Sequence, residues 1–286
     1  MKESIHTPYK ELDIVLENYT LKLKETLKHN LVGVYLQGSL AIGDFDMTSD
    51  VDFMVVINDE LSDKEVKLIQ KIHDDVYKQD YRWVKRLEYS FFPKEKLNEI
   101  SSPFENGKEN NSEDRKLWYF DNGSKKIEKS DHDNTLVVRW TVREKGFALF
   151  GPDPKEFINP VNPNDLRREI KETMLGWGKQ LLKDASPYKN RFYQSYLVLN
   201  FSRMLHDLYM GKVSSKLEAM RWAKLNLDSK WLNLIDFCWE ERQDTSISVK
   251  QPAKDEVFKR SLEFVAYTLE KAEKFIMCNN IVSRSI

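Results

Sequence analysis

Two aspartates, Asp50 and Asp52, stand two positions apart where an apolar, β-rich run begins. In an extended strand alternate side chains point to the same face, so we expect the two carboxylates side by side, with Val51 and Phe53 on the other face. Adjacent carboxylates repel each other unless a cation lies between them. Oxygen ligands that leave positions for water or phosphate suit Mg²⁺. The spacing therefore predicts a magnesium site at Asp50 and Asp52.

A Gly-Ser pair, Gly38 and Ser39, follows the apolar run 32–37 and precedes the aspartates. Glycine lets the backbone approach a phosphate closely, and serine offers a hydroxyl and an N–H at the start of a predicted short helix. Taken singly, the Gly-Ser pair is typical of a turn and the aspartates of a solvated strand edge, because short motifs occur by chance. Together, in the order strand, Gly-Ser, aspartates, strand, they predict a site for nucleotide chemistry.

The elements that must position these residues form a small α/β arrangement. Apolar residues at helical spacing indicate helices, and β-rich runs indicate strands. The predicted helices are 9–30, 67–79 and 131–149, and the predicted strands are 32–37, 51–57 and 82–93. The polar, aperiodic stretch 101–114 is predicted to be a mobile loop, with a lid as one hypothesis. This order of elements predicts a mixed sheet flanked by helices.

The second half of the chain is predicted to be wholly helical. Four prolines in GPDPKEFINPVNPND stiffen this stretch and end the preceding helix, so we place a boundary between domains 1–152 and 153–286. Asn162 and Pro163 are typical of an N-cap and a first helical position, and Ser215 with Glu218 is typical of a capping box. The predicted fold class is α+β, a mixed-sheet domain followed by an α-helical bundle.

Charge and composition exclude several classes of protein. Lys plus Arg total 45 and Asp plus Glu total 46, and the resulting net charge of −1 argues against a protein that binds long nucleic acid by bulk electrostatics. The first residues lack a signal-like apolar region, and no run is long enough to cross a bilayer. Two cysteines without a CxxC motif are typical of reduced thiols. We expect a cytoplasmic protein with no nucleic-acid or membrane partner.

The stretch GSLAIGDFDMTSDVDFMVV resembles the signature of the DNA polymerase β-like nucleotidyltransferases, in which Gly-Ser, a spacer and Asp-x-Asp follow one another. The resemblance implies use of Mg-NTP and a third carboxylate on a neighbouring strand. Glu88, on the predicted strand 82–93, fits that place and would be the general base for the acceptor hydroxyl. On its own, Glu88 would be interpreted as an exposed strand residue.

In the second half, GPDPKEFINPVNPNDL and YLVLNFSRMLHDLYMGKVSSKLEAMRWA resemble bacterial aminoglycoside adenylyltransferases of the streptomycin/spectinomycin type, and the likeness covers nearly the whole chain. It implies transfer of AMP from ATP to a drug hydroxyl, with release of pyrophosphate. In that family an arginine and a lysine of the helical domain hold the triphosphate in a cleft between the domains. The matching residues are Arg203 and Lys216. The alternative is a surface lysine and an arginine paired with Asp207, a common pairing on helices.

The resemblance also implies a cationic antibiotic as acceptor, and therefore an acidic pocket with aromatic walls. The candidate residues are Trp118, Asp121, Asp131, Asp133, Tyr188, Tyr193 and Tyr196. The chain departs here from the members that accept streptomycin, which place acidic residues just before and at the start of the helix that carries the arginine. No carboxylate stands between Pro187 and Tyr196. This departure favours spectinomycin, or an unrelated hydroxyl compound, over streptomycin.

Two other interpretations stay open. One is a nucleotidyltransferase for another acceptor, such as a protein side chain or a lincosamide-like drug. The other is a non-catalytic, nucleotide-binding regulator, although such a protein has no reason to keep clustered carboxylates. His132, in SDHDN, is expected to be a capping or structural residue. We expect a monomer or weak dimer, and the sequence does not decide which hydroxyl is modified or whether nucleotides besides ATP are used.

Overall fold

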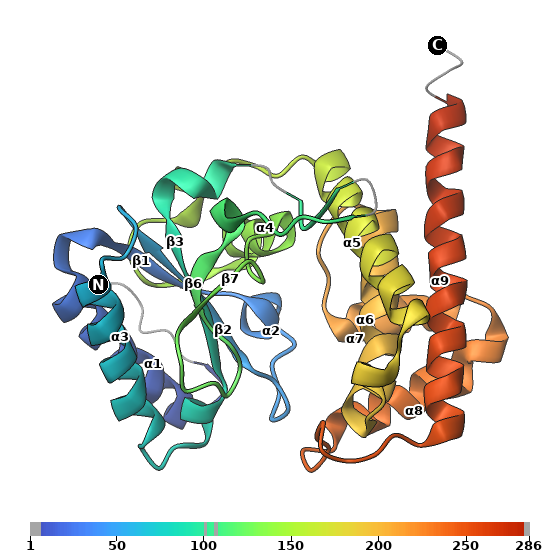
Figure 1. Ribbon diagram of the computed structural model, residues 1–286, viewed down its shortest axis with the longest axis horizontal. Coiled ribbons are helices and arrows are strands. Elements are labelled where there is room, and N and C mark those ends of the chain that lie inside the picture. Colours follow the sequence, from blue (N-terminus) through green and yellow to red (C-terminus); the bar gives the residue numbers. More distant parts are fainter. Residues whose placement is uncertain (1–6, 100–101, 106–107, 283–286) are drawn as a thin grey trace. The chain divides into compact units, whose positions relative to one another are not determined.

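The computed structural model describes residues 7–99, 102–105 and 108–282, with side chains described up to residue 275. The chain divides into two compact units (Figure 1). The first unit comprises Met1–Phe45, Ser49–Ser101 and Asn111–Val161, and the second comprises Asp46–Thr48, Ser102–Asn110 and Asn162–Ile286. Residues 153–161, which the sequence prediction assigned to the helical domain, group with the first unit. Ile158 is buried in a core cluster of that unit, which explains the grouping.

A six-stranded mixed sheet forms the centre of the first unit, in the order β7-β6-β3-β2-β1-β8. Its strands are β1 (Leu31–Leu36), β2 (Val51–Ile57), β3 (Leu87–Pro93), β6 (Leu117–Phe120), β7 (Glu128–Ser130) and β8 (Phe147–Phe150). The β2–β3 pair is parallel, and every other neighbouring pair is antiparallel. The mixed sheet expected from the sequence is therefore confirmed, with more strands than the sequence indicated.

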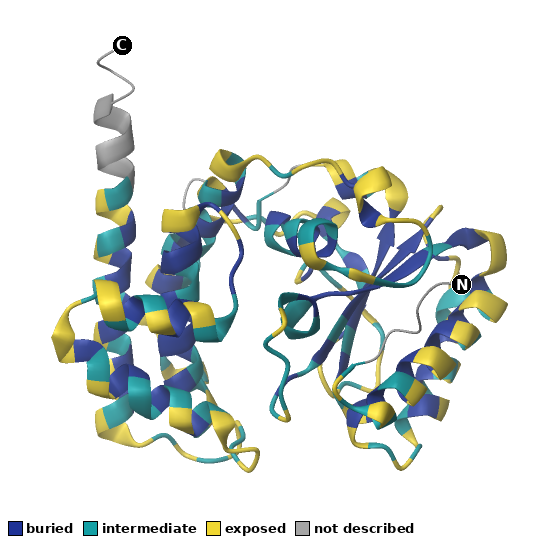
Figure 2. Cartoon of the chain, turned by 180° about the vertical axis from the view of Figure 1, so that it is seen from behind, coloured by how far each residue is buried: buried dark blue, intermediate teal, exposed yellow. Residues whose placement is uncertain are grey.

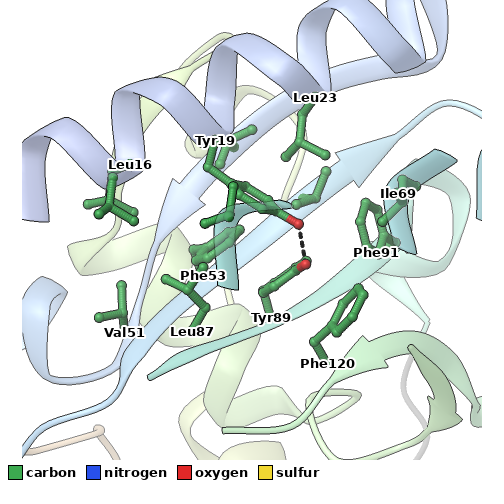
Figure 3. Close-up of a cluster of buried hydrophobic side chains, with 14 of the residues drawn as sticks. Leu16, Tyr19, Leu23, Val51, Phe53, Ile69, Leu87, Tyr89, Phe91 and Phe120 are labelled. Carbon is green, nitrogen blue, oxygen red and sulfur yellow. Dashed lines mark hydrogen bonds between the residues drawn. The ribbon is translucent and has the colours of Figure 1, made fainter. Parts of the chain in front are cut away.

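Helices α1 (Lys10–Leu27) and α3 (Asp63–Tyr77) cover one face of this sheet, because their apolar stripes pack on the odd-numbered residues of β2 and β3. Figure 3 shows this core, in which Leu16, Tyr19 and Leu23 of α1 point toward side chains such as Phe53 and Tyr89 on the strands. The rings of Phe53 and Tyr89 stack with their centroids 4.4 Å apart. Burial of aromatic area on this scale is a main source of the unit's stability.

A chain of hydrogen bonds runs through this apolar core. The hydroxyls of Tyr19 and Tyr89 bond each other (Figure 3), and the hydroxyl of Tyr89 lies 2.9 Å from Nδ1 of His73. His73 Nε2 lies 3.0 Å from the carbonyl oxygen of Ser124. A carbonyl only accepts, so Nε2 carries the proton and Nδ1 accepts from Tyr89. The chain ties α1, α3, β3 and the β6–β7 turn together.

The opposite face of the sheet has a smaller core, in which Tyr35, Met54 and Phe92 pack with Val142 of α4 (Leu136–Lys145). The short helix α2 (Gly38–Ile42) starts where β1 ends. Even-numbered residues of β2 and β3 point to this face, and among them are Asp52 and Glu88. The face that carries the predicted chemistry is thus opposite the face that α1 and α3 cover.

The second unit is mainly helical, as predicted. Its helices are α5 (Pro163–Lys183), α6 (Arg191–Met210), α7 (Lys216–Asn226), α8 (Leu232–Gln243) and α9 (Asp255–Val282). Helix α6 is central, because it packs against the other four helices and buries most of its length (Figure 2). The predicted N-caps are present, since Asn162 accepts from Asn164 N and Ser215 accepts from Glu218 N, but the Glu218 side chain pairs with Lys212 and does not complete the predicted capping box.

Two predicted elements have different bounds, and three strands were not predicted. Residues 82–85 form a 3₁₀ helix, so the strand predicted over 82–93 begins at Leu87. The helix predicted over 131–149 is only α4, since the Thr135 side chain caps it by accepting from Val138 N and the chain turns into β8 after Gly146. Strands β6, β7 and β8 are only three or four residues long, and such short runs leave little alternation to detect.

The stretch predicted to be a mobile loop contains a hairpin, β4 (Phe104–Glu105) and β5 (Lys108–Glu109). Residues Ser102–Asn110 group with the helical unit. Phe104 is buried against α5, so close to Gly176 that a Cβ there would overlap the phenyl ring. The hairpin therefore has a packing role, and the lid hypothesis has no support from these contacts.

Cys238 is a buried thiol, and the side chain of Cys278 lies outside the described residues. Burial raises the pKa of Cys238 to about 12, which keeps the thiol protonated and unreactive. Among the described residues, no helix combines the length and apolar character that a membrane span requires.

Candidate active site

Three carboxylates meet on adjacent strands of the first unit. Asp50 precedes β2, Asp52 is its second residue, and Glu88 is the second residue of β3. The parallel register places Asp52 directly beside Glu88. Oxygen atoms of Asp50, Asp52 and Glu88 all lie within 4.8 Å of one another. The strand alternation that predicted the aspartate pair also brings Glu88 to the same face.

Gly38 and Ser39 start α2 immediately beside Asp52. Gly38 has a φ of 57°, in the left-handed region, and a Cβ at this position would overlap the Asp52 carboxylate. Only glycine combines this backbone conformation with such a close approach. The hydroxyl of Ser39 is buried and has no hydrogen-bond partner among the described residues. A buried polar atom without a partner is costly, so this hydroxyl is suited to a ligand.

Glu88 is held by two side chains that contact one of its carboxylate oxygens. The Tyr119 hydroxyl donates to Glu88 Oε1 at 2.7 Å and lies 3.2 Å from Asp121 Oδ1. His132 Nε2 lies 3.4 Å from the same Oε1 atom. Burial, together with the Glu88 charge, raises the pKa of Tyr119 far above its ordinary value, so the hydroxyl remains a donor.

His132 and Asp133 give the edge of this site a mixed charge. The hydrogen bond to Glu88 raises the pKa of His132 to about 9, although 63 % of the side chain is exposed. Burial raises the pKa of Asp133 to about 6, even though Ser90 donates to Asp133 Oδ2 at 2.8 Å and Gln37 donates to the same carboxylate. The histidine charge thus offsets part of the negative charge of the neighbouring acids.

The residues present fit a hard divalent cation. The donors at Asp50, Asp52 and Glu88 are all carboxylate oxygens, the ligand type that Mg²⁺ prefers. Asn122 Nδ2 lies 3.5 Å from Asp50 Oδ2, so Asp50 also has a polar neighbour on this edge. A second cluster of Glu88, His132 and Asp133 includes an imidazole, and Asp133 in it already accepts from Ser90. The all-oxygen cluster therefore suits Mg²⁺ better, with Asp50 and Asp52 as the candidate ligands and Glu88 beside them.

The residues of this unit that were predicted to contact the antibiotic separate into two groups. Asp121 lies beside Tyr119 and thus near Glu88, and Asp133 lies on the same face. Trp118 packs with the core under α1 and α3, on the opposite face of β6 from Tyr119, and Lys129 Nζ lies 4.9 Å from its ring centroid. Asp131 pairs with Arg115 at 3.3 Å. The structure does not bring Trp118 to the carboxylates.

In the second unit, Arg203 and Lys216 lie near one face of α6. Arg203 donates to Asn200 Oδ1 at 2.9 Å, while the Asp207 carboxylate is bonded by His206 and Ser214. Lys216 is the first residue of α7, and its Nζ lies 5.7 Å from the ring centroid of Tyr196. Tyr196 and Arg203 are seven positions apart, a spacing that places them on the same side of a helix.

The three predicted tyrosines come together at the start of α6. The ring centroids of Tyr188 and Tyr193 are 5.0 Å apart, and those of Tyr193 and Tyr196 are 5.6 Å apart. The first residue of α6, Arg191, is a cation, and it forms two hydrogen bonds to the carboxylate of Glu241 on α8. The structure therefore gathers Tyr188, Tyr193, Tyr196 and Lys216 into one aromatic and cationic cluster of the helical unit.

Sequence reasoning missed Tyr119 and assigned His132 a structural role. Both contact Glu88. The available indication for Tyr119 was the alternation of strand residues between the two faces of the sheet. Strand β6 is antiparallel to β3, and Tyr119 lies opposite Ser90, on the face of Glu88. That signal requires knowledge that 117–120 is a strand. For His132, which lies in a turn before α4, the sequence carried no comparable signal.

Comparisons with known proteins agree with the two-unit architecture. Residues 20–119 match the nucleotidyltransferase domain family, and residues 156–270 match the family described as the aminoglycoside adenylyltransferase C-terminal domain. The first match contains Gly38, Ser39, Asp50, Asp52 and Glu88, and the second contains Arg203 and Lys216.

Two kinds of curated relative are similar to the chain. A spectinomycin 9-adenylyltransferase of Staphylococcus aureus is 27% identical over 232 residues, covering 76% of this chain and 80% of the relative. An aminoglycoside (3'') (9) adenylyltransferase of Klebsiella pneumoniae is 22% identical over 229 residues, covering 80% of this chain and 69% of the relative.

Among solved structures, spectinomycin adenyltransferase AAD(9) from Enterococcus faecialis, crystallised with ATP and spectinomycin, has a similar fold. The TM-score is 0.65 at 17% sequence identity, and the match covers 90% of this chain and 98% of that one. At this identity the likeness concerns the fold, which includes both the sheet and the helical part.

Proposed function

Because the chain is a nucleotidyltransferase of the aminoglycoside adenylyltransferase family, we propose that it transfers AMP from ATP to a hydroxyl of spectinomycin and releases pyrophosphate. The observation that carries this proposal is the cluster of Asp50, Asp52 and Glu88 within 4.8 Å, next to the Gly38–Ser39 turn. Three clustered carboxylates beside a buried serine hydroxyl that has no partner among the described residues fit a site for metal and phosphate.

The proposed reaction is an in-line displacement at phosphorus. The oxygen of the acceptor hydroxyl forms a bond to the α-phosphorus of ATP, and the bond from that phosphorus to the bridging oxygen of pyrophosphate breaks. The hydroxyl proton passes to the carboxylate of Glu88, which acts as general base. Atoms and charge balance, since AMP is joined to the acceptor, pyrophosphate leaves, and one proton is released.

Other residues of this chain are proposed to bind the metal ion and the triphosphate. Asp50 and Asp52 would hold Mg²⁺, which when bound neutralises charge on the phosphates. Ser39 and the adjacent backbone N–H are proposed to bind phosphate oxygens, and Arg203 and Lys216 to supply positive charge to the triphosphate. A cation in the first turn of α7 opposes the helix dipole, so Lys216 at this position is better explained if it binds an anion.

Two observations support spectinomycin over streptomycin as the acceptor. The stretch that leads into α6 contributes no carboxylate between Pro187 and Tyr196, and its two cations, Lys189 and Arg191, pair with Asp255 and Glu241. The relative that is 27% identical is named as a spectinomycin enzyme. Tyr188, Tyr193 and Tyr196, and Asp121 in the other unit, stay the proposed acceptor contacts, and Tyr119 takes the place of Trp118 as the aromatic residue beside Glu88.

The test is an assay of pyrophosphate release by the purified protein with Mg-ATP and each of spectinomycin, streptomycin, other aminoglycosides and a lincosamide. We expect release with spectinomycin, and AMP found on the drug by mass spectrometry. Release with a lincosamide alone would assign a different acceptor. If no drug caused pyrophosphate release and AMP were found on a protein, a protein would replace the antibiotic as the proposed acceptor.

Asp52→Asn tests the metal assignment within the same assay. Removing one carboxylate charge weakens Mg²⁺ binding, so we expect turnover to fall about a hundredfold or more. Asp59→Asn, an exposed aspartate just beyond the end of β2, is the matched control and should keep wild-type turnover. Full activity of the Asp52 variant at low Mg²⁺ would exclude Asp52 as a ligand.

A further inference from the structure

The described partners of Glu88 contact one of its two carboxylate oxygens. Tyr119 donates to Oε1 at 2.7 Å, and His132 Nε2 lies 3.4 Å from the same atom. A carboxylate whose one oxygen is fixed can still receive a proton on the other. The two partners therefore distinguish the oxygens of Glu88 from each other.

We propose that Tyr119 is a positioning residue, whose hydroxyl fixes Glu88 Oε1 and leaves Oε2 to take the proton of the acceptor hydroxyl. The inference rests on the proposed function and deepens it, because it names the residue that orients the general base. Tyr119 touches neither reacting atom in this scheme and acts through Glu88.

The surroundings of Tyr119 make its hydroxyl a fixed donor. Its side chain is 3 % exposed and is fixed by β6, which pairs with both β3 and β7. A tyrosine hydroxyl has a single proton, and an ionised carboxylate can only accept. The Tyr119 hydroxyl oxygen lies 2.7 Å from Glu88 Oε1 and 3.2 Å from Asp121 Oδ1, so its stronger hydrogen bond is the one to Glu88. Asp121 is the second, more distant acceptor for the same proton.

Glu88 itself needs such support. A glutamate side chain has three rotatable bonds, and Glu88 is 12 % exposed, at the edge of the site. A misplacement of about 1 Å at a reacting group can cost about a hundredfold in rate. A hydrogen bond from a rigid strand neighbour restricts the carboxylate to one orientation, which an exposed histidine alone would do less well.

The experiment compares Tyr119→Phe with wild type in pyrophosphate release. We expect kcat to fall about tenfold to a hundredfold while KM for ATP stays within about twofold, because the phenyl ring keeps the packing and only the hydrogen bond is lost. Tyr77→Phe is the matched control: it removes a hydroxyl of α3 that bonds the Gly123 carbonyl at 3.4 Å and should leave kcat unchanged. Unchanged kcat in the Tyr119 variant, or a change in KM alone, overturns the proposal.

A double variant separates action through Glu88 from a general structural effect. In a Glu88→Gln background, measured in single turnover with enzyme in excess, Tyr119→Phe should change the residual rate by less than about twofold. An equal fold-loss in both backgrounds would show that Tyr119 acts independently of Glu88, and would overturn the inference.

Crystal structures of wild type and Tyr119→Phe decide the inference even if no drug is turned over. We expect a single Glu88 conformation in the wild type and several, or a rotated one, in the variant. Absence of turnover with every acceptor would remove the proposed function, whereas an unchanged, well-ordered Glu88 in the variant would remove the positioning role.

Discussion

At the scale of the residue, the site depends on a glycine as much as on its acids. Gly38 has a positive φ and faces Asp52 so closely that no other residue type fits. Gly43, five positions later, has a φ of 85°, but a Cβ added there would meet no atom within 4 Å. The two glycines thus share a left-handed backbone conformation and differ in what a methyl group would meet.

Gly38→Ala is therefore expected to lower kcat about a hundredfold or more, because the new methyl displaces the Asp52 carboxylate. Gly43→Ala should lower the free energy of unfolding by about 1–2 kcal/mol, the cost of a left-handed conformation for a residue with a Cβ, and Gly38→Ala should lower it by more, because its Cβ also overlaps the Asp52 carboxylate. Turnover and urea unfolding of both variants check this. A Gly43 variant that loses as much activity as the Gly38 variant would contradict the collision argument.

At the scale of the element, α1, α3 and β3 are joined by the buried hydrogen bonds of Tyr19, Tyr89 and His73. Burial lowers the pKa of His73 below its ordinary value of 6.5, so the folded protein holds the neutral ring. The neutral form is also the one that can accept from Tyr89 while donating to the Ser124 carbonyl.

The stability of the sheet unit should therefore depend on pH through His73. Above about pH 6.5 the ring is neutral in both folded and unfolded chains, and the stabilisation is fully present. As the pH falls below 6.5 toward the lowered folded pKa, the unfolded chain binds the proton more readily, so the free energy of unfolding falls.

Urea unfolding at about pH 7.5 and about pH 5.5, on either side of the ordinary histidine pKa, measures this dependence. Wild type should lose stability between the two pH values, and His73→Gln should lose less, although its stability at the higher pH is lower because the stacking on Phe120 is gone. His29→Gln, which replaces an exposed histidine, is the control. An equal loss in wild type and His73→Gln would rule out His73 as the source.

At the scale of the whole molecule, the two compact units do not follow the order of the sequence. The segment 102–110 lies in the first half of the chain but groups with the helical unit, with Phe104 against Gly176 of α5. The chain thus passes between the units more than once, and the helical unit needs a segment from outside residues 162–286.

Phe104→Ala should lower the stability of the helical unit by about 3 kcal/mol, because a buried phenyl ring is lost from α5. Leu225→Ala, at a side chain 85 % exposed, is the control and should change stability by less than about 0.5 kcal/mol. Thermal unfolding monitored by calorimetry measures both. Wild-type stability of the Phe104 variant would mean that the hairpin does not contribute to the unit.

The sequence by itself determined the acids, the glycine-serine turn and the helical character of the second half. These are local properties: a period of two places Asp50 and Asp52 on one face, and caps and apolar stripes define helices such as α5 and α7. The position of Glu88 came from a resemblance, and the parallel β2–β3 register is consistent with it. The roles of the site residues stay predictions that the experiments above address.

Only the tertiary structure decided which aromatic residue stands beside Glu88. Trp118 and Tyr119 are adjacent in the sequence, and a shift of one residue in a strand exchanges the two faces of a sheet, so their sides depend on the pairing of β6 with β3. The short strands β6 to β8 are stabilised by partners distant in the chain, and no local pattern encodes such partners. The aspartate pair and the glycine-serine turn were therefore local information, whereas the residues that surround Glu88 were not.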